Sequence, residues 1–390
     1  MPSPAADAVI YLDNAATSWP KPPAVAASIV DFLEHRAGNP GRSGHALAVA
    51  ADAVVAATRS ELAALFGAPD PARIVFTLNA TDALNMALWG LLVPGDRVVT
   101  TSMEHNAVVR PLHALAERGV IVTRVACAPD GTLDLDDLDR ALRSGPVRLV
   151  AMCHASNVVG TILPARDAAR LAHEHGSLFL LDAAQTAGVL PIDVREMGID
   201  LLAVPGHKAL LGPTGTGALY VAPGVRLTPL RQGGTGTRSG EEHQPEELPA
   251  GLEAGTLNTV GIAGLGASLR YLRGRGREAI HAHETSLTAR LIHGLADVAG
   301  VTIHGTRDAA LQVATVSVSL DGWEPVDVAA ALDSSFGIAV RAGLHCAPVA
   351  HRTLGTFPRG TVRLSPGLFS TNEDVDRAVT AIRKLARTVG

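Results

Sequence analysis

The residues best suited to chemistry follow two short apolar runs. The run Leu178–Leu181 is too short for a helix and is typical of a strand buried on both faces, and Asp182 and Gln185 come directly after it. A second run, Leu201–Val204, is followed by Pro205-Gly206-His207-Lys208. Open α/β sheets bind their ligands in the crevice beyond the carboxyl ends of the strands. We therefore expect Asp182 and Lys208 to face one crevice.

Lysine is rare in this chain. Lys and Arg together number 33, but only Lys21, Lys208 and Lys384 are lysines. An amine can form a Schiff base with an aldehyde, whereas a guanidinium, permanently charged, cannot. A nearby aspartate can pair with the pyridinium nitrogen of pyridoxal phosphate. Lys208 is therefore the candidate cofactor lysine, and we expect Lys21 and Lys384 to be ordinary surface residues.

Composition describes a globular enzyme-sized chain. The 390 residues are 47% hydrophobic and 18% charged, enough for a large core. The net charge of -5 and the lack of a basic run give no reason to expect nucleic acid. No apolar segment approaches the roughly 20 residues that span a bilayer. The first residues lack the features of a secretory signal, so we expect a cytoplasmic protein without a membrane partner.

Apolar strand signals and helix signals alternate from about residue 73 to residue 221, which predicts a mainly parallel sheet with helices on both faces. After Gly261 the pattern changes to a mixture typical of a smaller α+β unit. We expect a large domain over 21–264 and a small domain over 1–20 and 265–390. Within the latter, a strand is expected over Ile338–Arg341 and a loop over Ala342–Gly360.

Two further polar residues follow predicted strands. His105 comes after Arg97–Thr101, and Asn157 comes after Val147–Cys153. An imidazole at a strand end could stack on an aromatic cofactor and move protons, although an incidental residue at a helix N-terminus is equally compatible with the sequence. The same ambiguity applies to Asn157. Four candidates at four strand ends nevertheless indicate one rim of one sheet.

The junction Asn79-Ala80-Thr81-Asp82 joins a predicted strand to a predicted helix. Small polar residues there leave backbone N–H groups free at a helix N-terminus, where phosphate groups bind. The alternative is a helix cap with no ligand.

The three cysteines differ in their surroundings. They are far apart, which argues against disulfides or a cysteine zinc site, and we expect no metal. Cys127 and Cys153 lie at strand ends among apolar residues and are expected to be packed and inert. Cys346 lies in a Gly/Pro loop near Arg and His, whose positive charge favours a reactive thiolate. Arg363, on the next strand, could hold a substrate carboxylate through a bidentate pair or could be a surface arginine.

Eight motifs, in order and over nearly the whole chain, resemble one family. They are Tyr11–Thr17, Asn39–His45, Met103-Glu104-His105, His154–Asn157, Asp182–Gln185, Gly206-His207-Lys208, Glu253–Asn258 and Arg341–Ala347. The family is the class V aminotransferase-like enzymes, and the resemblance is to its cysteine desulfurase and selenocysteine lyase group. It implies fold-type I, with a mainly parallel sheet in a large domain, a smaller α+β domain, and pyridoxal 5'-phosphate. It also implies a homodimer with shared active sites.

The resemblance implies a role for each matching residue. Lys208, His105 and Cys346 would be catalytic, with Lys208 holding the cofactor, Asp182 pairing with its ring nitrogen and His105 stacking on the ring. The other implied cofactor-binding residues are Gln185, Asn157, Ala80, Thr81, His207 and the partner subunit's Thr256. The implied substrate-binding residues are Arg363, Arg42, Asn14, Ala15 and Asn157.

The implied reaction converts L-cysteine to L-alanine and transfers the sulfur to Cys346 as a persulfide, which a separate acceptor protein could clear. Three departures bear on it: Pro205 replaces a common Ser or Thr, Leu344 replaces a second His, and one extra residue separates Lys208 from Gly212-Pro213. One alternative is a selenocysteine lyase, and another is an epimerase or transaminase in which Cys346 is incidental. A third, from another class, is a cofactor-free scaffold that binds a sulfur-carrier partner.

Overall fold

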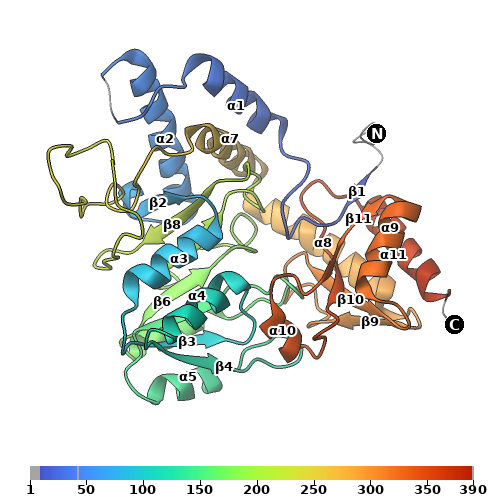
Figure 1. Ribbon diagram of the computed structural model, residues 1–390. Helices are drawn as coiled ribbons and strands as arrows, with labels where there is room; N and C mark the ends of the chain where they lie inside the picture. Colours follow the sequence, from blue (N-terminus) through green and yellow to red (C-terminus); the bar gives the residue numbers. More distant parts are fainter. Residues whose placement is uncertain (1–8, 42–43, 389–390) are drawn as a thin grey trace.

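A seven-stranded sheet forms the centre of the larger part of the molecule (Figure 1). The computed structural model describes residues 9–41 and 44–388. The strands of this sheet are β2 (Ile74–Thr77), β3 (Arg97–Thr101), β4 (Ile121–Val125), β5 (Leu149–Cys153), β6 (Leu178–Asp182), β7 (Leu201–Pro205) and β8 (Gly217–Val221). They lie in the order β2-β8-β7-β6-β5-β3-β4, and only β8 runs antiparallel to its neighbours. The carboxyl ends of the other strands therefore meet at one edge, and the expected mainly parallel sheet is confirmed.

Strands buried on both faces explain the continuous apolar runs. In β6, Phe179 and Leu181 enter the core on one face, and Leu180 enters the core on the other. The first face is covered by α2 (Ala46–Leu65), α5 (Leu135–Arg143), α6 (Ala165–Glu174) and α7 (Thr259–Arg275). The second is covered by α3 (Ala80–Leu91) and α4 (Asn106–Ala116). In addition, α1 (Pro23–His35) packs against α7.

A second core lies around a four-stranded antiparallel sheet, drawn in orange and red in Figure 1. Its strands, in the order β12-β13-β10-β9, are β12 (Arg341–Gly343), β13 (Thr361–Leu364), β10 (Val316–Leu320) and β9 (Val301–His304). Its helices are α8 (Arg277–Ala296), α9 (Pro325–Phe336) and α11 (Asn372–Ala386). The N-terminal strand β1 (Ile10–Tyr11) joins this part by pairing with β11 (Ile338–Ala339).

Two expectations for the smaller part are wrong. The strand expected over Ile338–Arg341 is two strands, because the chain leaves the pairing of β11 with β1 and enters the pairing of β12 with β13. The loop expected over Ala342–Gly360 contains the helix α10 (Pro348–Thr353), whose six residues are too few to show a helical period.

The division into domains stays a prediction. The boundary expected at residue 264 falls inside α7, which packs against α1 and α2. Within residues 9–41 and 44–388, no helix is both long and apolar enough to cross a membrane.

Candidate active site

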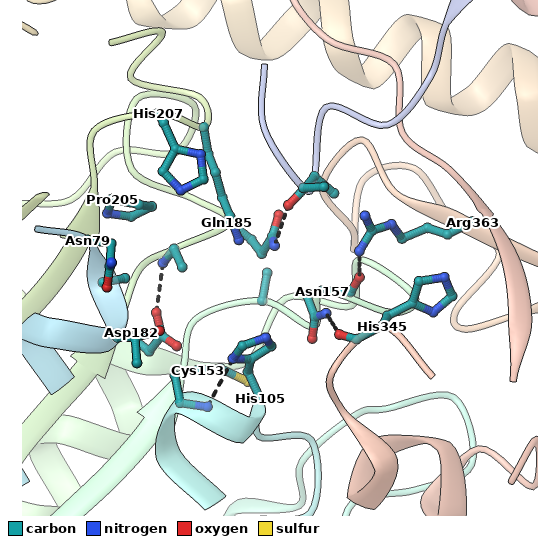
Figure 2. Close-up of a pocket in the computed structure, with 18 of the residues that line it drawn as sticks. Asn79, His105, Cys153, Asn157, Asp182, Gln185, Pro205, His207, His345 and Arg363 are labelled. Carbon is teal, nitrogen blue, oxygen red and sulfur yellow. Dashed lines mark hydrogen bonds between the residues drawn. The ribbon is translucent and has the colours of Figure 1, made fainter. Parts of the chain in front are cut away.

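A cavity of about 300 Å³ opens at the edge where the parallel strands end (Figure 2). Its walls come from the ends of β5, β6 and β7, from the segments that follow β1, β2 and β3, and from the smaller part of the molecule. The expected site residues that line it are Ala15, Ala80, Thr81, His105, Asn157, Asp182, Gln185, His207, Lys208 and Arg363. Residues far apart in the sequence therefore meet in one place.

Three of the expected site residues that the structure describes are not in this wall. Cys346 is exposed, on the segment between β12 and α10. Asn14 lines a smaller adjoining cavity, which it shares with Lys208. Thr256 is exposed and lies outside the cavity of its own chain. Arg42 lies outside the residues that the structure describes.

Lys208 is suited to act as a nucleophile. It follows β7 and lines the cavity, and burial lowers the pKa of its amine to about 8, assisted by Arg363 and Arg341 and opposed by Asp182. A lower pKa increases the neutral, nucleophilic fraction of an amine at physiological pH. Ser18 Oγ donates a hydrogen bond of 2.8 Å to the Lys208 carbonyl, which fixes the backbone of this residue.

Asp182 is a buried acid that requires a positively charged partner. Burial raises its pKa, while the backbone N–H of Ala184 and the charge of Lys208 lower it. A cation brought to this carboxylate would reverse the cost of its burial. This carboxylate, an acceptor, therefore fits the positively charged pyridinium N–H of pyridoxal phosphate, which donates.

His105 both caps a helix and lines the cavity, so its place at a helix N-terminus does not exclude a role in the cavity. Its Nδ1 accepts the backbone N–H of Ala107 at 3.0 Å, at the N-terminus of α4. Burial, together with the charge of Lys208, lowers the pKa of its ring to about 4. The ring is neutral at physiological pH, with its hydrogen on Nε2.

Asn157 and Arg363 form the other end of the cavity, as Figure 2 shows. Arg363 Nη1 donates to the Asn157 carbonyl at 2.9 Å, and its Nη2 donates to Asp13 Oδ1 at 2.7 Å. Within the described part of the chain, Asn157 Oδ1 and Arg363 Nε are buried without a hydrogen-bond partner. Buried polar atoms of this kind are costly, and a bound ligand can satisfy them.

The N-terminus of α3 forms the left wall of the cavity in Figure 2. Asn79 caps this helix by accepting the backbone N–H of Asp82 at 2.9 Å, and Ala80 and Thr81 also line the cavity. Nearby, the His207 ring lies 3.1 Å from Thr17 Oγ1. Free N–H groups at a helix N-terminus and a ring nitrogen suit a phosphate group.

Cys346 is exposed beside the cavity, on the segment between β12 and α10. Its Sγ lies 3.6 Å from Nη2 of Arg341, which lines the cavity, and its carbonyl accepts the N–H of Asn106 at 2.8 Å. The neighbouring His345 is buried, and burial lowers its pKa far below the usual range. Of the two expected cationic neighbours, only Arg341 is charged.

Several residues of this region were not expected from the sequence. Asn79, Arg341 and His345 line the cavity, and the only sequence signal for them was membership of motifs that were singled out for other residues. The expectation for Lys21 is wrong, because its Nζ donates to Ser18 Oγ and to the His207 carbonyl, both at 2.7 Å. A lysine between prolines gave no sign of this burial. Across residues 9–41 and 44–388, no three His, Cys, Asp or Glu side chains gather as a metal site.

Known proteins resemble this chain over nearly its whole length. The sequence profile of the family "Aminotransferase class-V" matches residues 10–378. A probable cysteine desulfurase of Methanothermobacter thermautotrophicus is 36% identical over 384 residues, which cover 97% of this chain and 94% of that protein. A second, from Halalkalibacterium halodurans, is 34% identical over 391 residues, covering 98% and 94%.

Solved structures show the same similarity. The apo structure of cysteine desulfurase from Thermococcus onnurineus superposes with a TM-score of 0.92 at 33% identity and covers 98% of this chain and 96% of that one. The cysteine desulfurase CsdA from Escherichia coli, with an S-sulfonic acid, gives a TM-score of 0.86 at 31% identity, with the same coverage.

Proposed function

This chain belongs to the aminotransferase class-V family, and from that premise we propose that it is a pyridoxal-phosphate-dependent cysteine desulfurase. The family and the fold class expected from the sequence are confirmed. The observation that carries the proposal is the placement of an exposed thiol, Cys346, against an arginine of a cavity that also holds Lys208 and Asp182. An epimerase or transaminase has no use for that thiol.

The cavity residues fit the cofactor from end to end. Asp182 would hold the ring nitrogen, His105 would cover the ring, and the N-terminus of α3 with His207 would hold the phosphate. Asn157 and Gln185 would lie at the phenolic side of the ring, where Asn157 Oδ1, an acceptor without a partner in the described structure, could accept from a donor of the bound molecule. When bound, pyridoxal phosphate supplies a sink for the electrons released at the substrate Cα.

Three residues of this chain would then bind the substrate, accept its proton and take its sulfur. Arg363 binds the carboxylate of L-cysteine, since its Nε lacks a partner in the described structure and its guanidinium is held rigid by Asp13. Neutral Lys208 accepts the proton from Cα. The Cys346 thiolate attacks the substrate sulfur, so that the substrate C–S bond breaks and an S–S bond forms. Cys346–SH and L-cysteine thus become Cys346–S–SH and L-alanine.

A second copy of the chain is part of the proposal. Thr256 is exposed and lies outside its own cavity, which supports its supply to the phosphate end of a partner's cavity. The exposure of Cys346 supports transfer of the persulfide sulfur to a separate acceptor protein.

Alanine release tests the proposal. We expect wild type, incubated with L-cysteine and a reductant, to release alanine catalytically, and Cys346→Ala to lose this activity. The matched control is Cys127→Ala, which removes a buried thiol outside the cavity and should leave the rate unchanged. Equal alanine release by wild type and Cys346→Ala would contradict the proposal and favour a lyase that does not need this thiol. A preference for selenocysteine with Cys346 dispensable would indicate a selenocysteine lyase.

A further inference from the structure

The backbone at Cys346 has an unfavourable conformation that contacts with other residues must stabilise. His345 and Cys346 have φ angles of +48° and +57°. This left-handed region is unfavourable for residues with a side chain, and such conformations persist only where surrounding contacts hold them. The geometry of the reactive thiol therefore depends on the contacts of its neighbours.

Two hydrogen bonds hold the segment against the large sheet. The side-chain amide of Asn157 donates to the His345 carbonyl at 2.7 Å, and the backbone N–H of Asn106 donates to the Cys346 carbonyl at 2.8 Å. Both donors follow strands that end at the cavity. They fix the carbonyl groups of the segment but leave the His345 side chain to be held by other residues.

A row of hydrogen bonds holds the His345 side chain from the opposite side. His345 Nε2 lies 3.3 Å from the Arg341 carbonyl, and its Nδ1 lies 3.3 Å from His351 Nε2. His351 Nδ1 lies 2.7 Å from Thr356 Oγ1. The two rings stack with centroids 5.5 Å apart.

The donor and the acceptor of each of these three hydrogen bonds follow from the groups involved. The Arg341 carbonyl can only accept, so His345 Nε2 donates and its Nδ1 accepts. His351 Nε2 therefore donates to His345, and Thr356 donates to His351 Nδ1. This needs both rings neutral, and burial lowers the pKa of His351 to about 4 and that of His345 further.

His351 has no place in the chemistry described above. It lies on α10, it is 0% exposed, and it is not part of the cavity wall. We propose that His351 is a positioning residue, which holds the Cys346 segment in its left-handed conformation through His345, with Thr356 orienting the His351 ring. The effect on catalysis rests on the proposed function of Cys346, whereas the positioning itself does not.

The test uses two substitutions with opposite expectations. In His351→Gln, the amide can donate to His345 Nδ1 and its oxygen can accept from Thr356, so the row of hydrogen bonds is kept. His351→Phe fills the space of the ring but breaks both hydrogen bonds. His175→Phe is the matched control. His175 is a half-buried histidine whose Nε2 lies 2.8 Å from Asp139 Oδ1, and it is not part of the cavity wall.

Three readouts on the cofactor-loaded enzyme separate positioning from general damage. We expect His351→Phe to slow persulfide formation on Cys346 by about tenfold or more, and His351→Gln to restore it to within about threefold of wild type. Exchange of the Cα hydrogen of L-alanine in deuterated water needs Lys208 but not Cys346, and should be unchanged in every variant. Hydrogen exchange at the Asn106 amide should accelerate in His351→Phe alone.

Two results would overturn the inference: wild-type amide exchange at Asn106 in His351→Phe, or an equal loss in His351→Phe and His351→Gln. If His351→Phe does not fold, Thr356→Val takes its place, because it removes only the hydroxyl donor. It should accelerate the same amide exchange, and an unchanged rate would count against the proposal. If wild type forms no persulfide, the proposed function fails, while the amide exchange still decides the role of His351.

Discussion

Arg363 is the residue whose environment says most about the substrate. It is 1% exposed, its two terminal nitrogens are used by Asp13 and Asn157, and its Nε is buried without a partner in the described structure. Asp13 offsets the cost of burying the guanidinium and holds it in one orientation. A rigid, planar donor next to the cavity is a good site for a carboxylate.

Replacing Arg363 by lysine should therefore weaken substrate binding while keeping the charge. We expect Arg363→Lys to raise the KM for L-cysteine by about tenfold to a hundredfold, because a compact ammonium cannot reproduce the planar set of donors. Steady-state alanine release measures this effect. The control is Arg359→Lys, an exposed arginine that binds the Trp323 carbonyl at 2.8 Å, and its KM should not change. An unchanged KM in Arg363→Lys would remove the carboxylate role.

At the scale of elements, the phosphate end depends on close packing between β8 and α3. A Cβ added to Gly217 on β8 would lie 2.8 Å from the Asn79 backbone, the cap of α3. Because Gly217 has no side chain, β8 packs closely against the N-terminus of α3, which keeps this N-terminus at the cavity.

Gly217→Ala should consequently displace the N-terminus of α3. We expect the affinity for pyridoxal phosphate to fall by about tenfold, since the helix N–H groups no longer meet the phosphate correctly. Titration of the cofactor-free protein, followed by absorbance, measures the affinity. Gly274→Ala, in helix α7 with nothing within 4 Å of the added Cβ, should leave the affinity unchanged. Equal affinities in the two variants would argue against phosphate binding at α3.

The sequence predicted elements and site residues unequally well, for physical reasons. Strands such as β6 are apolar on both faces and end in polar residues, so both their position and the rim that they form were predictable. The split between β11 and β12 was not, because it depends on which strands they pair with. The pairing of His345 with His351 depends on the fold of α10, a helix too short to leave a pattern.

At the scale of the whole molecule, buried ionisable groups accumulate around the site. Burial lowers the pKa of His105, His154, His207 and His351 to about 4. It raises the pKa of Glu104 and Glu284 to about 8. The two groups of residues change the free energy of unfolding with pH in opposite directions.

Stability should pass through a maximum near pH 6.5. Below that value the unfolded chain binds protons at these four histidines and at His345, all of which stay neutral in the folded protein, so the free energy of unfolding decreases as the pH falls towards 4. The two glutamates oppose this effect from their ordinary pKa of 4.5 up to about 8, because the folded protein keeps protons that the unfolded chain has lost. Above pH 6.5 the histidines no longer bind protons in either state, so stability decreases as the pH rises towards 8. Urea unfolding from pH 4.5 to 8 would reveal this maximum.

Glu284→Gln isolates the alkaline half of this prediction. Glu284 lies on α8 and is not part of the main cavity wall, and glutamine is a neutral side chain of similar shape. We expect the variant to lose less stability than wild type between pH 6.5 and 8, by about 1–2 kcal/mol at pH 8. A parallel pH dependence in both proteins would show that Glu284 is ionised in the folded state.

The whole account depends on sulfur reaching Cys346. The most direct measurement is the mass of this residue after one turnover: the holoenzyme is mixed with L-cysteine in the absence of reductant, free and persulfide thiols are alkylated, and the peptide is analysed by mass spectrometry. The account predicts one added sulfur on Cys346, in an amount equal to the alanine formed, and none on Cys127 or Cys153. Alanine formed without added sulfur on Cys346 would contradict it.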